Sequence, residues 1–193
     1  MLWRTMTEAI PPHILLGAYA QGVFPMADEG ELHWFSPLRR GVMPLDERFH
    51  IPHGLERRLR RCPFELRMNT DFAGVMAGCA DREQTWIDAT IKESYTELFK
   101  LGFAHSVEVW DEDGLQGGLY GVRLRRAFFG ESMFSRKTDA SKVALVGLVE
   151  WLRAEGVILL DTQWLTPHLA TFGGFEMTRA EYLKALAEAI GEG

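Results

Sequence analysis

Residues 105–135 have the sequence HSVEVWDEDGLQGGLYGVRLRRAFFGESMFS, which contains three apolar runs separated by two breaks. The first break is the polar DEDG at 111–114, and the second is an arginine-rich connection at 123–126. Short runs rich in Val, Tyr and Phe between such breaks are typical of strands joined by tight turns. The stretch therefore predicts an antiparallel meander of three strands.

A helix and a buried strand follow the meander. Thr138 or Asp139 can open the helix, and Gly156 is placed to end it. VILLDTQW at 157–164 is a short apolar run that ends in polar residues, as a central strand does when its tip reaches a site. Because the helix must return the chain to a strand beside the last meander strand, we expect a cleft between these two strands.

Helical spacing of apolar residues predicts four helices before the meander, over residues 12–21, 51–62, 72–79 and 91–101. Residues 64–69 alternate and predict a strand, and TRAE at 178–181 is a capping box that begins a last helix. Residues 23–44 are dense in Pro, Gly and aromatic side chains and have no period. That segment predicts a packed, non-repetitive loop.

The order of these elements is that of an acyltransferase-type α+β domain. We expect a small N-terminal domain over residues 1–62, which carries an arginine-rich helix. A catalytic domain over residues 63–193 would contain a mixed, mainly antiparallel sheet flanked by helices.

Composition excludes several classes of protein. The chain has 193 residues, of which 47% are hydrophobic and 25% charged, so fibrous and disordered proteins are excluded. Cys62 and Cys79 have no metal-binding spacing, which favours a reducing compartment, the cytoplasm. No apolar run approaches the roughly 18 residues of a membrane span, and the first ten residues lack a signal-peptide core. We expect no membrane association.

Charge is distributed unevenly along the chain. The net charge is −6, but residues 37–68 contain eight arginines and four acidic residues, a local net of +4, so the remainder carries −10. Four of these arginines surround the apolar stripe of the helix at 51–62: Arg57, Arg58, Arg60 and Arg61. The cluster fits a phosphate-binding face on an acidic protein or a solvated helix face.

Polar residues stand out in two apolar segments. Glu131 lies among Phe and Met side chains at 128–134, where a carboxylate is costly unless donors or a cation meet it. Asp161 and Gln163 lie two apart on a strand and would project from the same face. Together they could orient an amine nucleophile, although a structural role for all three is the alternative.

Two aromatic residues lie on neighbouring strands of the meander. Trp110 and Tyr120 could stack on nucleobases or belong to the core. Three glycines near Tyr120, at 117, 118 and 121, favour the close approach of a ligand or of another backbone.

Long phrases of the sequence carry a resemblance to a known family. They are QGVFPM with HWFSP, TWI at 85–87, YTELFKLGFAHSVEVW at 95–110, GGLYGV at 117–122, FFGESMFSRKTDASKVAL at 128–145 and LLDTQWLTPHLATFGG at 159–174. By these phrases the chain resembles the leucyl/phenylalanyl-tRNA–protein transferases of the bacterial N-degron pathway. The resemblance implies a small N-terminal domain and a domain similar to the N-acetyltransferase (GNAT) fold.

The resemblance also implies an activity, namely transfer of Leu or Phe, with Met as a further candidate, from charged tRNA to proteins beginning with Arg or Lys. The acceptor would be the N-terminal α-amine, and the product would be marked for degradation. Asp161 and Gln163 match the family's catalytic pair, and Glu131 matches the acid that organises the site. An aminoacyl ester is already activated, so we expect neither a cofactor nor a metal.

Further site residues follow from the same resemblance. Those matching the wall of the amino-acid pocket are Met133, Leu145 and Leu160. Aromatic residues matching the surroundings of the 3′ terminal adenosine and the amino acid are Trp110, Tyr120 and Phe128. Trp34 and Ser36 match a loop that borders the site. The tRNA acceptor stem would lie on Arg57, Arg58, Arg60 and Arg61, and we expect a monomer.

Two other classes remain as alternatives. An acyl-CoA-dependent N-acetyltransferase needs a glycine-rich turn before the helix that follows the meander, but no glycine occurs at 131–146. A non-catalytic RNA-binding module would leave Asp161, Gln163 and Glu131 unexplained. His50 and His53 flank Pro52 without acids or thiols at ligand spacing, so they predict no metal site.

Overall fold

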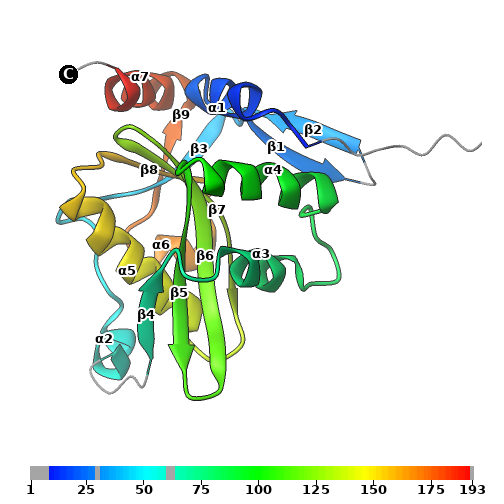
Figure 1. Ribbon diagram of the computed structural model, residues 1–193. Coiled ribbons are helices and arrows are strands. Elements are labelled where there is room, and N and C mark those ends of the chain that lie inside the picture. The colour runs from blue at the N-terminus through cyan, green and yellow to red at the C-terminus, as the bar shows by residue number, and fades with distance from the viewer. Residues whose placement is uncertain (1–8, 29–30, 60–63, 192–193) are drawn as a thin grey trace, which may run out of the picture.

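A seven-stranded sheet runs through the molecule in the order β4-β5-β6-β7-β8-β3-β9 (Figure 1). The computed structural model describes residues 9–28, 31–59 and 64–191, without the side chain of Arg58. The strands of this sheet are β4 (Glu65–Met68), β5 (Ala104–Asp111), β6 (Gly114–Leu124), β7 (Ala127–Ser135), β8 (Leu159–Gln163), β3 (Arg39–Met43) and β9 (Phe175–Thr178). Neighbouring strands are antiparallel except β7 and β8, which are parallel.

The predicted meander is confirmed as β5, β6 and β7, and the predicted return strand is β8. β7 and β8 pair only from Ala127 with Leu159 to Phe129 with Asp161. Beyond that pair, β7 continues to Ser135, whereas Gln163 at the end of β8 pairs with Gly41 of β3 alone, on the other side of β8. The two strands therefore separate just where Glu131 and Gln163 occur.

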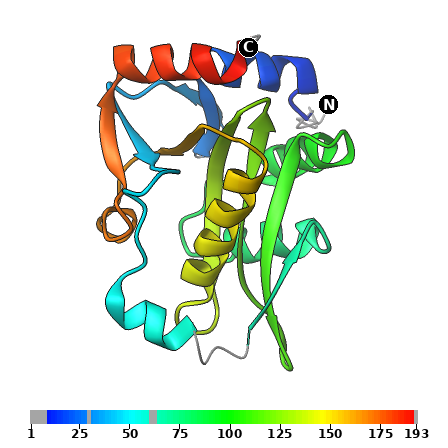
Figure 2. The same ribbon diagram turned by 90° about the vertical axis from the view of Figure 1, so that its left-hand side faces the viewer.

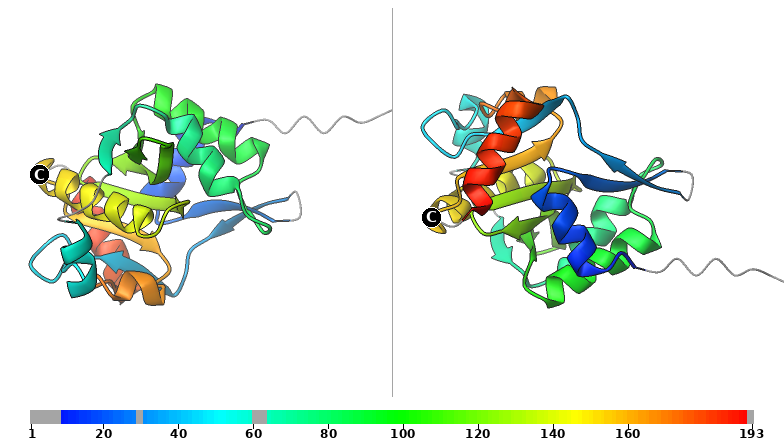
Figure 3. Two further views of the ribbon diagram at one scale, coloured as in Figure 1. Left: turned by 90° about the horizontal axis from the view of Figure 1, so that it is seen from below. Right: turned by 90° about the horizontal axis from the view of Figure 1, so that it is seen from above.

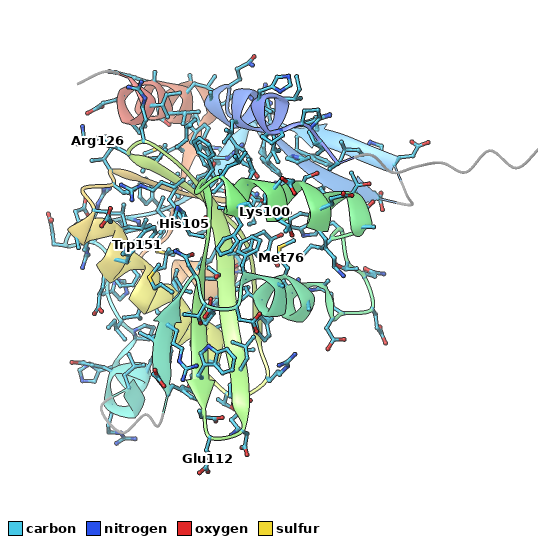
Figure 4. All side chains as sticks on the ribbon, in the orientation of Figure 1. Met76, Lys100, His105, Glu112, Arg126 and Trp151 are labelled. Atoms are coloured by element: carbon cyan, nitrogen blue, oxygen red, sulfur yellow. The ribbon has the colours of Figure 1, made fainter. Side chains whose placement is uncertain are left out.

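Helices cover both faces of the meander (Figures 2 and 3). α5 (Ala140–Ala154) packs on one face, where Phe128 belongs to its core cluster. α3 (Phe72–Ala80) and α4 (Ala89–Lys100) pack on the other face with Phe129. In Figure 4, Met76 lies in the core between α3 and α4, whereas Trp151 of α5 lies near His105 of β5.

Two helices lie side by side across one end of the sheet, α1 (Pro12–Ala20) and α7 (Arg179–Ile190) (Figures 1 and 3). The predicted capping box of α7 is confirmed, because Thr178 and Glu181 exchange hydrogen bonds between side chain and backbone. α2 (His53–Leu59) lies near the opposite end (Figure 1). α6 (Pro167–Ala170) is a single turn after β8.

The prediction of a non-repetitive loop over residues 23–44 is wrong. β1 (Phe24–Asp28) and β2 (Glu31–Phe35) form a two-stranded hairpin, and β3 lies inside the large sheet between β8 and β9. β2 buries no face, so its sequence lacks alternation. β3 is buried at four of five positions but contains Arg40, which interrupts the apolar run expected of a central strand.

The GNAT-like α+β class is confirmed by this arrangement. The domain boundary expected at residue 62 stays a prediction. β3 lies within the first 62 residues, yet it is a strand of the seven-stranded sheet. Among the described residues, no helix combines the length and apolarity that crossing a bilayer requires.

Candidate active site

A pocket of about 530 Å³ opens where β7 and β8 separate. Ligand pockets typically enclose about 300–1,000 Å³, so this one can hold a small-molecule group. Its walls come from β6, β7, α5, β8 and α6, with Trp86 from the connection between α3 and α4. Among the described residues that line it, Glu131 is the acid and Arg82 the guanidinium.

Glu131 is held in the wall of the pocket by three donors. Tyr19 donates to its Oε1 atom at 2.6 Å, Tyr95 donates to Oε2 at 3.1 Å, and Gln163 Nε2 donates to Oε2 at 3.2 Å. The hydroxyls of Tyr19 and Tyr95 also contact each other. Burial raises the pKa of Glu131 to about 7, although the bonds from Tyr19 and Tyr95 act in the opposite direction.

Asp161 lies behind the pocket, fully buried and paired with Arg40. The Arg40 guanidinium donates from Nε at 2.9 Å and from Nη2 at 2.6 Å, and Tyr182 donates its hydroxyl at 2.6 Å. Arg40 is only 1% exposed, and its guanidinium lies over the rings of Phe24 and Tyr182. The charge of Asp161 is thus neutralised by a buried cation.

Gln163 links the two carboxylates. Its backbone N–H donates to Asp161 Oδ1 at 2.7 Å, while its side chain donates to Glu131. Its φ of 64° is left-handed, a conformation that costs a non-glycine residue about 1–2 kcal/mol. The strand alternation behind the expected shared face of Asp161 and Gln163 therefore ends at Gln163.

A close backbone approach fixes the turn after Gln163. A Cβ atom on Gly41 of β3 would lie 2.5 Å from the backbone nitrogen of Leu165, so only glycine fits there. Trp164 packs edge-on against Phe24 and Phe35. The β1–β2 hairpin and β3 thus shape the end of β8.

Three polar atoms of residues that line the pocket are buried without a hydrogen-bond partner among the described residues. They are Tyr120 Oη, Thr162 Oγ1 and His168 Nε2. Burial, followed by the charge of Lys142, lowers the pKa of His168, so its imidazole is neutral at neutral pH. These atoms are available to hydrogen-bond a ligand.

Comparison with known proteins identifies the family. A family model described as leucyl/phenylalanyl-tRNA protein transferase matches residues 42–187, and the model of that family's N-terminal domain matches residues 8–38. The chain belongs to the leucyl/phenylalanyl-tRNA protein transferase family. It is therefore an aminoacyltransferase.

Relatives of that name cover nearly the whole chain. The protein from Akkermansia muciniphila is 57% identical over 192 residues, with 97% of this chain and 100% of the relative covered. The protein from Herpetosiphon aurantiacus is 51% identical, with 96% and 97% covered.

Solved structures are similar in fold alone. FemX has a TM-score of 0.57 at 9% identity, with 86% of this chain and 66% of that chain covered. L-PGS from Bacillus licheniformis has a TM-score of 0.51 at 9% identity, with 80% and 65% covered.

The pocket of this transferase brings together six of the residues expected from the sequence. They are Glu131, Gln163, Tyr120, Met133, Leu145 and Leu160. Five others lie outside its walls, among them Asp161 behind the pocket. Phe128 is in the core beneath α5, and Trp110 lies under the Arg67 guanidinium. Trp34 is 42% exposed on β2 and borders a separate hollow beside α1, while the backbone oxygen of Ser36 accepts from Arg179.

Sequence reasoning missed several side chains of the site. Arg40, Tyr19, Tyr95 and Tyr182 hold the carboxylates from distant parts of the chain, and no local pattern marks them. Trp86 and His168 line the pocket and lie within the phrases TWI and LLDTQWLTPHLATFGG, which were the available signal.

The arginine cluster of the transferase is described only in part. Arg57 is exposed on α2. Leu55 and Leu59 form the apolar side of this helix as predicted, but the helix begins at His53, so Ile51 packs on the core from the segment before it. Arg60 and Arg61 lie outside the described residues, as does the side chain of Arg58.

Proposed function

We propose that this chain transfers Leu or Phe from charged tRNA to the N-terminal α-amine of proteins that begin with Arg or Lys. It would act in the cytoplasm as a monomer, and its products would be marked for degradation. The observation that carries the proposal is the pocket at the β7–β8 separation, where an apolar wall adjoins Glu131 and Gln163.

The apolar wall suits the side chain of the transferred amino acid. Met133, Leu145 and Leu160 line it together with Leu148 and Leu169. Burying a polar side chain against them would cost its hydration without compensation. Unbranched Met and the leucines can adapt to Leu, Phe and Met, which favours these three amino acids over charged ones.

The polar end suits the incoming amine. Transfer forms one C–N bond, breaks the ester C–O bond to the tRNA 3′ oxygen, and moves one proton off the nitrogen. The ester carries its own activation, so the site must mainly hold the two reactants together. Gln163 and Glu131, 3.2 Å apart at Nε2 and Oε2, are the polar pair beside which the amine would lie.

Asp161 acts through Gln163 in this proposal. Its carboxylate is occupied by Arg40, Tyr182 and the backbone of Gln163. It therefore serves as a positioning residue that holds the left-handed backbone of Gln163. Gln163 and Glu131 are the proposed catalytic residues.

A cationic first residue on the acceptor fits the charge of the site. Arg40 neutralises Asp161, so Glu131 is the carboxylate that faces the pocket. Arg82 also lines the pocket, where its guanidinium is bonded to Ser132 Oγ and the Met133 carbonyl oxygen rather than to Glu131. An Arg or Lys side chain near it gains a charge-assisted hydrogen bond, whereas an acidic side chain would be repelled.

The tRNA would approach from two directions. Trp86 and Trp164 line the pocket and offer rings for the terminal adenosine. The ring of Tyr120 is fully buried, so its contribution would be its unpaired hydroxyl. Trp34 and Ser36 lie on or next to the hairpin strand β2, and we propose that this hairpin borders the bound 3′ end. Arg57 and its neighbours on α2 would hold phosphates of the acceptor stem.

One assay tests the function. The protein is incubated with leucyl-tRNA and a peptide that begins with Arg, and the mass of the peptide is measured by mass spectrometry. A gain of one leucine residue at the N-terminus is expected. The same peptide with an acetylated N-terminus, and one that begins with Asp, should gain nothing. No gain on the Arg peptide with fresh leucyl-tRNA would refute the proposal.

A further inference from the structure

Three oxygen-bearing side chains from three separate elements meet at one point behind the pocket wall. They are Tyr19 of α1, Tyr95 of α4 and Glu131 of β7. Both phenols are fully buried, and Glu131 is 8% exposed where it borders the pocket. We call this group the Tyr–Tyr–Glu cluster.

The two phenols supply the hydrogen-bond protons of the cluster. Burial raises the pKa of Tyr19 and of Tyr95 well above the usual value, so both phenols keep their protons. Tyr19 donates to Oε1 of Glu131, and Tyr95 donates to Oε2. The carboxylate therefore accepts one hydrogen bond from each phenol, and both bonds lower the pKa of Glu131.

Within the part of the chain that the structure describes, the polar contacts of Glu131 are with Tyr19, Tyr95 and Gln163, and none of them is a cation. The titratable and charged groups around it are Tyr19, Tyr95 and Tyr120 from α1, α4 and β6, Asp161 from β8, Arg40 from β3, Tyr182 from α7 and Arg82 after α3. Arg82 donates to Ser132 Oγ and to the backbone oxygen of Met133. Arg40 makes its ion pair with Asp161. The ionised form of Glu131 therefore depends on hydrogen-bond donors rather than on an ion pair.

We propose that Tyr19 and Tyr95 are positioning residues that hold Glu131 as the proton acceptor of the transfer step. This inference rests on the proposed function and adds the base and its support. The neutral amine attacks the ester carbonyl, the C–N bond forms, and the proton leaves the nitrogen for Glu131. The C–O bond breaks, and the 3′ oxygen takes a proton from water. Glu131 then returns its proton to water, so the cycle is balanced.

The phenols act by stabilising the carboxylate. A hydrogen bond to a charged group is roughly twice as strong as one between neutral groups. Removing either hydroxyl should therefore destabilise the ionised form more than the protonated form. Because only the difference between the two bond strengths shifts the titration, the midpoint of Glu131 should rise by about 0.5–1 pH unit.

The first test needs no activity. The protein is labelled with ¹³C-glutamate, the side-chain carboxyl signal of Glu131 is assigned by its loss in Glu131→Gln, and it is titrated by NMR. Tyr19→Phe and Tyr95→Phe should each move the midpoint upward by about 0.5–1 pH unit. Tyr120→Phe is the matched control. The ring centroid of Tyr120 lies 5.6 Å from that of Tyr95, and its buried hydroxyl donates no hydrogen bond to Glu131. It should leave the midpoint unchanged.

An unchanged or lowered midpoint in a folded Tyr19→Phe or Tyr95→Phe protein would overturn the proposal, as would an equal shift in Tyr120→Phe. The two variants are independent, so one that folds, as judged by its thermal melt, is enough to decide.

The second test is the pH profile of single-turnover transfer. The wild-type rate should fall on the acidic side with the titration of Glu131, and the fall should move upward in both tyrosine variants. Titration of the peptide amine does not depend on the variant, so it cannot produce such a movement. A profile that stays in place while the rate drops uniformly would overturn the role of Glu131 as the base. Absence of transfer by the wild type would instead refute the proposed function, and the NMR result would stand separately.

Discussion

Replacing Arg40 by Met tests how the site is held together. Met fills similar space without charge, so the substitution leaves Asp161 buried with one phenol and one backbone N–H as its partners. Arg40 also donates to the backbone oxygen of Gly22 at 2.9 Å, and that contact is lost as well. The change therefore exposes the cost of an uncompensated interior charge.

The magnitude follows from burial. Arg40 is 1% exposed and Asp161 is 0% exposed, so neither charge is solvated in the folded state. Removing one partner of such a pair typically costs about 3–5 kcal/mol of stability, because the remaining charge stays buried. We expect Arg40→Met to lower the free energy of unfolding by an amount in that range. Transfer should also fall, since Asp161 positions Gln163.

Arg48→Met is the matched control. Arg48 pairs with Asp46 through the same Nε and Nη2 atoms, at 2.7–3.0 Å, but these side chains are 60% and 43% exposed. Exposed pairs add little to stability, so this variant should unfold almost as the wild type does. Urea unfolding followed by circular dichroism compares the three proteins. Equal losses for Arg40→Met and Arg48→Met would refute the reasoning from burial.

Three further predictions concern pH, specificity and RNA binding. Burial raises the pKa of Glu131 from 4.5 to about 7, so its contribution of about 3 kcal/mol to stability is complete below pH 4.5 and lost as pH rises through 7. The free energy of unfolding should therefore fall with pH between 4.5 and 8 in urea unfolding, and Glu131→Gln should remove this dependence. An identical pH dependence in the variant would contradict the prediction. Met133→Ala should enlarge the pocket and favour Phe over Leu by about 1–3 kcal/mol in competition assays, and an unchanged ratio would leave Met133 a core residue. Arg57→Ala/Arg61→Ala should raise the KM for charged tRNA and flatten its salt dependence by about 0.7–0.9 in slope per lost phosphate contact, whereas an unchanged slope would make the cluster a solvated helix face.

The sequence predicts those parts of the fold whose cause is local. The meander follows from apolar runs separated by turn residues. The capping box at Thr178 and Glu181 is a contact between residues three apart, so the sequence shows it directly. The return of the chain to β8 follows from connectivity, and with it the place of the cleft.

The parts that could not be predicted depend on distant partners. Arg40 is read locally as an exposed cation, yet Asp161, 121 positions away, makes it a buried residue of a central strand. Tyr19 and Tyr95 occupy ordinary apolar positions of α1 and α4, and only the folded chain brings their hydroxyls to Glu131. The left-handed backbone of Gln163 likewise depends on Gly41 of another strand.

The most direct test of whether transfer takes place at the β7–β8 separation is the rate of single-turnover transfer from leucyl-tRNA. It is measured for Gln163→Ala, Asp161→Asn and the double variant. Each single change should slow transfer by about 10²-fold or more, the scale of lost positioned proton-transfer help. Because Asp161 acts through Gln163, the double variant should be little slower than either single variant, with binding of aminoacyl-tRNA nearly unchanged. Near wild-type rates in the single variants, or fully multiplicative losses in the double variant, would contradict the account.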